Sequence, residues 1–175
     1  MNTKILACFI VLSLANGCKK DGLEISFDMD YSTSFTIQSN TGISLPFDFF
    51  TPDITTNSEE EFESNDTRKD KIKEILLKKL ALKITAPEGR DFDFLKDINL
   101  YIRAEGLEES RYAFFENVPD GLTQLTLNSE GIDLAPYIKE DKFSLRAECV
   151  FDQTFNQDID VTADMLFGVK ANPLR

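Results

Sequence analysis

The sequence predicts an all-β fold, an antiparallel immunoglobulin-like β-sandwich of about eight to nine strands with one or two short helices, preceded by a signal peptide. Apolar and polar residues alternate with a period of two along most of the chain, which is the pattern of half-buried strands. Turn residues separate these segments at the spacing typical of sandwiches. Residues 23–175 are long enough for one domain with its own core and too short for two.

The first 17 residues have the layout of a secretory signal peptide. Lys4 is the only charged residue before Cys18, and residues 5–15 form an almost unbroken apolar run. At about 1.5 Å per residue, a helix over that run would cross only about half of a hydrocarbon core. A cleaved signal is therefore favoured over a spanning helix, and we expect residues 1–17 to be removed by cleavage between Gly17 and Cys18.

The end of this segment resembles the lipobox of bacterial lipoprotein precursors. In that family a small residue precedes a cysteine that is diacylated on sulfur and becomes the new N-terminus; Gly17 and Cys18 occupy these two positions here. Ala15 stands where leucine is commonest, and Asn16 where a small or apolar residue is usual. The resemblance implies lipid attachment at Cys18, with palmitate-type chains. An ordinary signal peptidase would cut the same bond.

The residues after Cys18 form a short tether. Residues 18–22 separate the cleavage site from the first strand-like segment, and Lys19, Lys20, Asp21 and Gly22 span at most about 15 Å. The run Lys-Lys-Asp also resembles the charged export signals of surface lipoproteins in the Bacteroidota. The resemblance implies a protein exported through the secretory pathway and held at the outer membrane or cell surface, close to the bilayer.

Strands are predicted wherever the alternation is regular. The segments are 23–29 with its continuation at 35–37, 43–49, 80–84, 98–102, 112–116, 125–127, 143–151 and 159–169. Pro46 favours an edge position for its strand. The last two segments are predicted to pair as a hairpin through residues 152–157. Turns are expected at 40–42, 87–89, 105–106 and 119–121.

Two short helical segments and one isolated helical turn are predicted. Residues 67–77 start with a capping-box pattern of Thr67 and Asp70 and place Ile72, Ile75 and Leu76 on one helical face. Residues 91–97 are expected to form one helical turn. Residues 132–138 are expected to form a short helical connection that Pro136 breaks.

An acidic loop is predicted at about 51–66. Its carboxylates, the weak candidates for a calcium site, are Glu59, Glu60, Glu61, Glu63 and Asp66. The Asp-x-Asp-x-Asp-Gly spacing of calcium loops is missing, so a solvated loop is favoured and no metal or cofactor is expected.

Composition excludes several classes of function. Without residues 1–17 the side chains carry a net charge of −13, which repels nucleic acid and anionic headgroups. The chain has no histidine, which removes Ser-His-Asp and Cys-His pairs and nearly all catalytic zinc and iron sites.

The remaining candidate chemistry has a structural explanation. Cys149 shares an alternating face with Phe143, Leu145 and Phe151, so we expect a buried, inert thiol; without acylation of Cys18, a Cys18–Cys149 disulfide is the alternative. The carboxylate pairs Asp28/Asp30, Asp91/Asp93 and Asp158/Asp160 are expected on solvated surface. Adjacent Phe114 and Phe115 must point to opposite faces of a strand.

The sequence thus predicts a membrane-anchored, non-enzymatic envelope lipoprotein that acts as a binding or structural module. Its partners would be the membrane, through the lipid, and another envelope protein. The alternative is a carrier of a hydrophobic ligand in the sandwich core, which a large internal apolar cavity would favour and a filled core would oppose. A carboxylate- or calcium-dependent enzyme is the least favoured interpretation.

Overall fold

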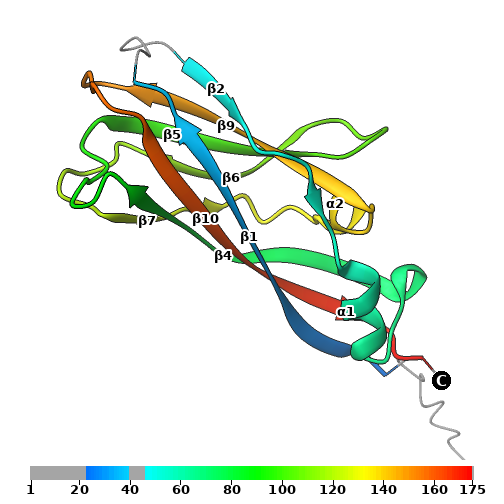
Figure 1. Cartoon of the computed structure of the whole chain (residues 1–175). Helices are drawn as coiled ribbons and strands as arrows, with labels where there is room; N and C mark the ends of the chain where they lie inside the picture. The colour runs from blue at the N-terminus through cyan, green and yellow to red at the C-terminus, as the bar shows by residue number, and fades with distance from the viewer. Residues whose placement is uncertain (1–22, 40–45, 175) are drawn as a thin grey trace, which may run out of the picture.

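Two antiparallel sheets lie face to face in the computed structural model, which describes residues 23–39 and 46–174 (Figure 1). The antiparallel β-sandwich predicted from the sequence is confirmed, with ten strands in the described residues instead of eight or nine. The predicted signal peptide, lipid-attachment site and tether (residues 1–22), and the turn predicted at 40–42, lie outside the described residues.

Each sheet combines strands from distant parts of the sequence. The four-stranded sheet contains, in spatial order, β1 (Ile25–Ile37), β10 (Ile159–Ala171), β4 (Ile72–Ala86) and β7 (Gln124–Thr126). The six-stranded sheet contains β2 (Pro46–Phe50), β9 (Lys142–Phe151), β5 (Leu95–Arg103), β6 (Ser110–Glu116) and β8 (Asn128–Ser129), and β3 (Ile54–Thr55) also pairs with β9. The edge position that Pro46 predicts for β2 is confirmed.

One side of the sandwich is closed by a strand that changes sheets. β7 pairs with β4, and two residues later β8 pairs with β6. Between them Leu127 is buried, and its N–H donates to the carbonyl of Leu80 at 3.0 Å. β1 and β2 form the edges on the other side.

The space between the sheets is filled by large side chains. Phe155 packs against the rings of Phe94 and Phe151 with centroid distances of 4.9 and 5.5 Å. Near the other end of the core, Tyr31 meets Phe143 and Phe167 edge to face at 5.7 and 5.9 Å. These rings and the alternating apolar faces of β9 and β10 form one continuous cluster of buried residues. The core faces predicted for residues 143–151 and 159–169 are confirmed.

The predicted hairpin of residues 143–151 and 159–169 is wrong. β9 pairs with β2, β3 and β5, whereas β10 pairs with β1 and β4 in the opposite sheet. The connecting segment buries Phe155 and crosses between the sheets. Alternation shows that each strand has one apolar face, but it does not tell whether two such strands lie side by side or face each other across a core.

The predicted helix over residues 67–77 is also wrong. A single 3-10 turn, η1 (Lys69–Lys71), leads directly into β4. The register of β4 against β10 shifts at Lys73 and at Lys78, so these residues are bulges. Buried residues are therefore three apart at Ile72 and Ile75 and at Leu77 and Leu80. Steps of three imitate helical periodicity, which explains the error.

The other two helical predictions need smaller corrections. Residues 91–97 form a hydrogen-bonded turn, in which the Leu95 N–H donates to the Phe92 carbonyl at 2.9 Å, and β5 begins at Leu95. The connection at 132–138 does contain a helix, α2 (Ala135–Ile138). Pro136 lies in its first turn, where a missing N–H breaks no hydrogen bond, so it begins the helix instead of breaking it.

The outer face of the four-stranded sheet is covered by paired polar side chains. Lys78 on β4 forms an ion pair with Asp28 on β1, across the intervening strand β10. Its aliphatic part lies over Gly168, where a Cβ would come within 2.5 Å of the lysine Cε. Ion pairs of Lys73 with Glu24 and of Lys170 with Glu74 continue this pattern. These three lysines are therefore paired with carboxylates of the protein itself.

Candidate functional site

The acidic segment is not the loop that the sequence predicts. Residues 51–66 contain β3 and a seven-residue helix, α1 (Ser58–Ser64). Phe62 holds the helix to the sandwich: it is fully buried, and its ring meets that of Phe27 edge to face at a centroid distance of 6.4 Å. Glu59, Glu60 and Glu61 occupy the first turn, where negative charge stabilises a helix.

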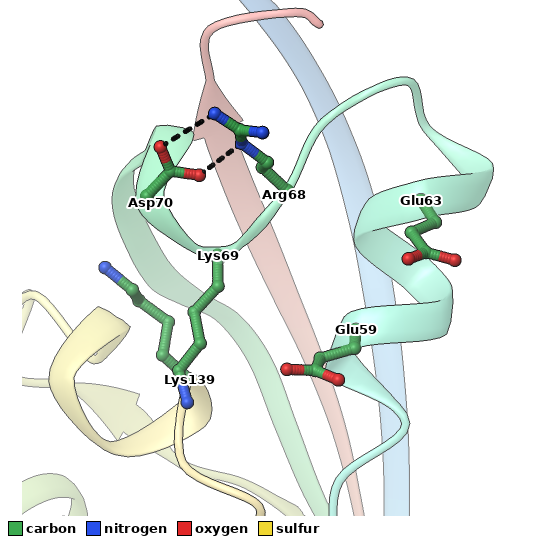
Figure 2. A pocket seen from close by; sticks show the side chains of 6 residues that line it. All are labelled: Glu59, Glu63, Arg68, Lys69, Asp70 and Lys139. Carbon is green, nitrogen blue, oxygen red and sulfur yellow. Dashed lines mark hydrogen bonds and ion pairs between the residues drawn. The ribbon is translucent and has the colours of Figure 1, made fainter.

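The five candidate calcium ligands do not converge. Glu59 and Glu63 line one side of a surface hollow of about 530 Å³ between α1, η1 and the end of α2 (Figure 2). Glu60 is exposed, and Glu61 accepts a hydrogen bond from Asn57 Nδ2 at 3.1 Å. Asp66 follows the helix with a positive φ of 55°. Across residues 23–39 and 46–174, no three acidic, cysteine or histidine side chains are grouped so that they could hold a metal ion.

The hollow itself carries balanced charge. Three basic residues (Arg68, Lys69 and Lys139) line it together with three acidic ones (Glu59, Glu63 and Asp70). Arg68 and Asp70 pair with each other through contacts of 2.6 and 3.3 Å, and this hydrogen bonding lowers the pKa of the Asp70 carboxyl (Figure 2). The hollow is therefore a solvated surface of mixed charge, in which Arg68 and Asp70 form an exposed ion pair.

The paired aspartates have structural partners. Thr36 Oγ1 donates to Asp160 at 2.7 Å, and the backbone N–H of Ser39 donates to Asp158 at 2.8 Å and lowers the pKa of that carboxyl. The N–H of Gly121 donates to Asp93, which ties the 119–121 turn to the segment before β5. Asp91 is half-buried, and its carboxylate accepts a hydrogen bond from the Asp93 N–H at 3.4 Å. Asp28 pairs with Lys78, and Asp30 is exposed.

Cys149 is a free thiol on the inner face of β9, as predicted. It is fully buried, and burial raises the pKa of the thiol well above its usual range, with the charges of Glu148 and Asp48 adding to the effect. The thiol is therefore protonated at neutral pH and is a poor nucleophile. Cys18 lies outside the described residues.

A surface that the sequence did not predict covers the outer face of the six-stranded sheet. Three arginines stack on three aromatic rings there, and we call these six residues the arginine–aromatic face. Guanidinium-to-centroid distances are 5.3 Å for Arg103 on Phe50, 4.0 Å for Arg146 on Tyr101 and 4.7 Å for Arg111 on Phe114. The prediction that Phe114 and Phe115 point to opposite sides is confirmed, since Phe115 packs against the core.

Arg146 is at the centre of this face. Only 15% of its side chain is exposed, and it contacts both carboxylate oxygens of Glu109 at 2.6–3.2 Å. Its other terminal nitrogen pairs with Asp48 and reaches Glu148 at 3.4 Å. These bonds raise the pKa of the guanidinium and hold β2, β9 and the segment before β6 in one arrangement. The alternation placed Arg146 on the outer face, but its partners come from strands that only the fold brings together.

Comparisons with known proteins add little to these observations. No family model and no curated protein matches the sequence. A chain of Desmodium yellow mottle tymovirus is a match among solved structures, with 8% identity and a TM-score of 0.30 over 99% of this chain and 97% of that chain. A likeness of this size does not bear on function.

Proposed function

We propose that this protein is a lipid-anchored envelope lipoprotein whose β-sandwich serves as a non-enzymatic binding module at the outer membrane or cell surface. The observation that carries the proposal is the position of Gly17 and Cys18, at the end of an apolar run and seven residues before β1 begins at Ile25. Two acyl chains on Cys18 would suffice for stable anchoring.

The described polar groups support a non-enzymatic module. Most of the paired aspartates hold turns and strands together, and Cys149 is buried and protonated. The carrier alternative has less support, because the rings of Phe94, Phe151 and Phe155 occupy the space where a ligand would lie. Within residues 23–39 and 46–174, none of the helices could span a bilayer.

The arginine–aromatic face is the surface that we assign to the partner, another envelope protein. Arginine and aromatic residues are enriched at the centres of protein interfaces, where a few such residues carry most of the binding free energy. Phe50 is 52% exposed at the edge strand β2. The ion pairs of Arg146 fix the face before a partner arrives, which lowers the cost of association.

Fractionation of cells that express the wild type or Cys18→Ser tests the anchor. The wild type should be found with the membrane, and its intact mass should correspond to residues 18–175 plus the acyl groups. Cys18→Ser should fail to anchor. A wild type recovered in soluble form with an unmodified Cys18 would refute the proposal.

A pull-down from detergent-solubilised envelope tests the face. Phe50→Asp should lose the captured protein, because it replaces an exposed apolar contact with a charge. Leu107→Asp is the matched control, since Leu107 is also an exposed apolar residue, at 38%, but lies outside the face. Equal capture by both variants would assign the partner to a different surface.

A further inference from the structure

Two of the exposed leucines lie together at one end of the sandwich. Among the described residues the exposed large apolar side chains are Leu23, Phe50, Leu107 and Leu174. Leu23 is 70% exposed just before β1, and Leu174 is 43% exposed just after β10. They are neighbours because Ile25 pairs with Ala171 in the sheet, at the end where α1 lies (Figure 1).

These leucines belong to a wider apolar surface. They line a shallow hollow of about 670 Å³ together with Ile25, Phe27 and Pro173. We call these five residues the basal surface. Exposed apolar patches of this kind, bordered by polar residues, are typical of sites that contact another molecule or a membrane.

The basal surface is held in place by backbone hydrogen bonds. The N–H of Leu174 donates to the Asp66 carbonyl at 2.6 Å, and that of Asn172 donates to the Lys71 carbonyl at 3.0 Å. Buried Thr67 donates from Oγ1 to the Asn172 carbonyl at 2.7 Å. Leu174 is thus fixed beside residues 66–71 with its side chain toward solvent.

Several charged side chains beside this surface pair with one another. Residues 66–73, which bind the segment that carries Leu174, contain four basic and two acidic residues, and α1 before them adds four glutamates. Arg68 and Lys71 both pair with Asp70, and Lys73 pairs with Glu24. The exposed leucines are therefore the groups of this surface that suit the acyl boundary of a bilayer.

We infer that the basal surface rests on the lipid bilayer, with Leu23 and Leu174 inserted at the boundary between headgroups and acyl chains. This inference depends on the proposed lipid attachment, because the five residue-to-residue steps from Cys18 to Leu23 span at most about 17 Å and keep this end of the domain next to the membrane. The domain would therefore contact the bilayer twice, through the lipid at Cys18 and through the basal surface. The second contact would fix the orientation of the domain relative to the membrane.

The absence of tryptophan from the sequence allows a direct test. Leu23→Trp and Leu174→Trp each introduce a single tryptophan fluorophore, and Leu107→Trp is the matched control. Each variant is attached to phosphatidylcholine vesicles in two ways: as the exported, membrane-derived protein, and as unacylated residues 18–175 coupled through the Cys18 thiol to a maleimide lipid. Buried Cys149 does not compete for the maleimide. Vesicle flotation records attachment separately from fluorescence.

On the vesicles, the tryptophan emission of the Leu23→Trp and Leu174→Trp variants should shift to the blue and be quenched by brominated lipid, while that of Leu107→Trp stays unchanged. Unshifted emission from the two basal variants on floating vesicles would overturn the inference. If the exported protein does not float but the maleimide-coupled protein floats and shows the shift, the lipid attachment is wrong and the basal contact stands.

Discussion

Cys149 shows how the environment of one residue sets a property of the whole protein. Its position on the inner face of β9 could be predicted from the alternation of residues 143–151 alone, because burial follows from periodicity. The consequence for the thiol pKa also needs the surrounding packing, which excludes water completely.

This raised pKa predicts that the protein loses stability in mild alkali. Above about pH 8.5 the thiol ionises in the unfolded chain but stays protonated in the folded one, so the free energy of unfolding should fall by about 1.4 kcal/mol per pH unit. Tyr31, whose pKa burial raises to about 12, adds to the loss only above about pH 10, where unfolded tyrosine ionises.

Urea unfolding from about pH 8 to about pH 10 measures this slope. The protein with Cys149 is compared with Cys149→Ala, and both carry Cys18→Ser so that Cys149 is the only thiol of the mature chain in the first protein. Cys149→Ala should be less stable overall, because it leaves a small cavity, but should lack the thiol-dependent slope. Parallel pH profiles for the two proteins would contradict the assigned burial of the thiol.

Arg146 marks the limit of what the sequence predicts for single residues. Its outward position on β9 follows from the alternation, but Asp48 and Glu109 are 98 and 37 residues away in the sequence. Nothing local indicates that these three side chains meet. The arginine–aromatic face therefore depends on the strand order, which the sequence pattern does not contain.

At the scale of elements, α1 shows how a single apolar residue outweighs its acidic surroundings. Phe62 is the one aromatic between Thr51 and Asp66, and this segment otherwise has the composition of a solvated loop. The sequence pattern does not predict the contact between Phe62 and Phe27, because it depends on how the fold places α1 beside β1.

Phe62→Ala should lower the free energy of unfolding by about 3–5 kcal/mol, the usual cost of emptying a buried phenylalanine site. Glu60→Ala, an exposed change on the same helix, should stay within about 0.5 kcal/mol of the wild type. Denaturant unfolding gives both values, and hydrogen exchange at the Glu61 amide, which bonds to Asn57, reports on α1 itself. Equal stability of the two variants would show that Phe62 does not hold the helix.

The errors in strand assignment have a common physical origin. Alternation reports which face of a strand is buried, and this was correct for β9 and β10. It fails where a bulge changes the phase, as at Lys73 and Lys78 in β4, and it carries no information on partners. Turn residues located the ends of strands well, as at Gly89 and Gly121, where positive φ angles favour glycine.

At the scale of the whole molecule, the fold class could be predicted because many short alternating segments leave few ways to bury one face each. The order of strands could not, since β1 pairs with β10 across more than a hundred residues of intervening chain. The same pairing decides the orientation proposed for the protein, because it brings Leu23 and Leu174 to one end.

Because Leu23 and Leu174 lie close together, the chain can be circularly permuted. A short glycine linker would join Leu174 to Leu23, and new chain ends would be made in the exposed turn between Glu88 and Gly89. The circular permutant should fold with stability close to that of the wild type, measured by denaturant unfolding, because no paired strand is cut. β1 spans about 43 Å and β4 runs alongside it through β10, so the new chain ends would lie at the opposite end of the sandwich. With residues 18–22 grafted before Gly89, the molecule would stand inverted on the bilayer and turn its leucines to the solvent.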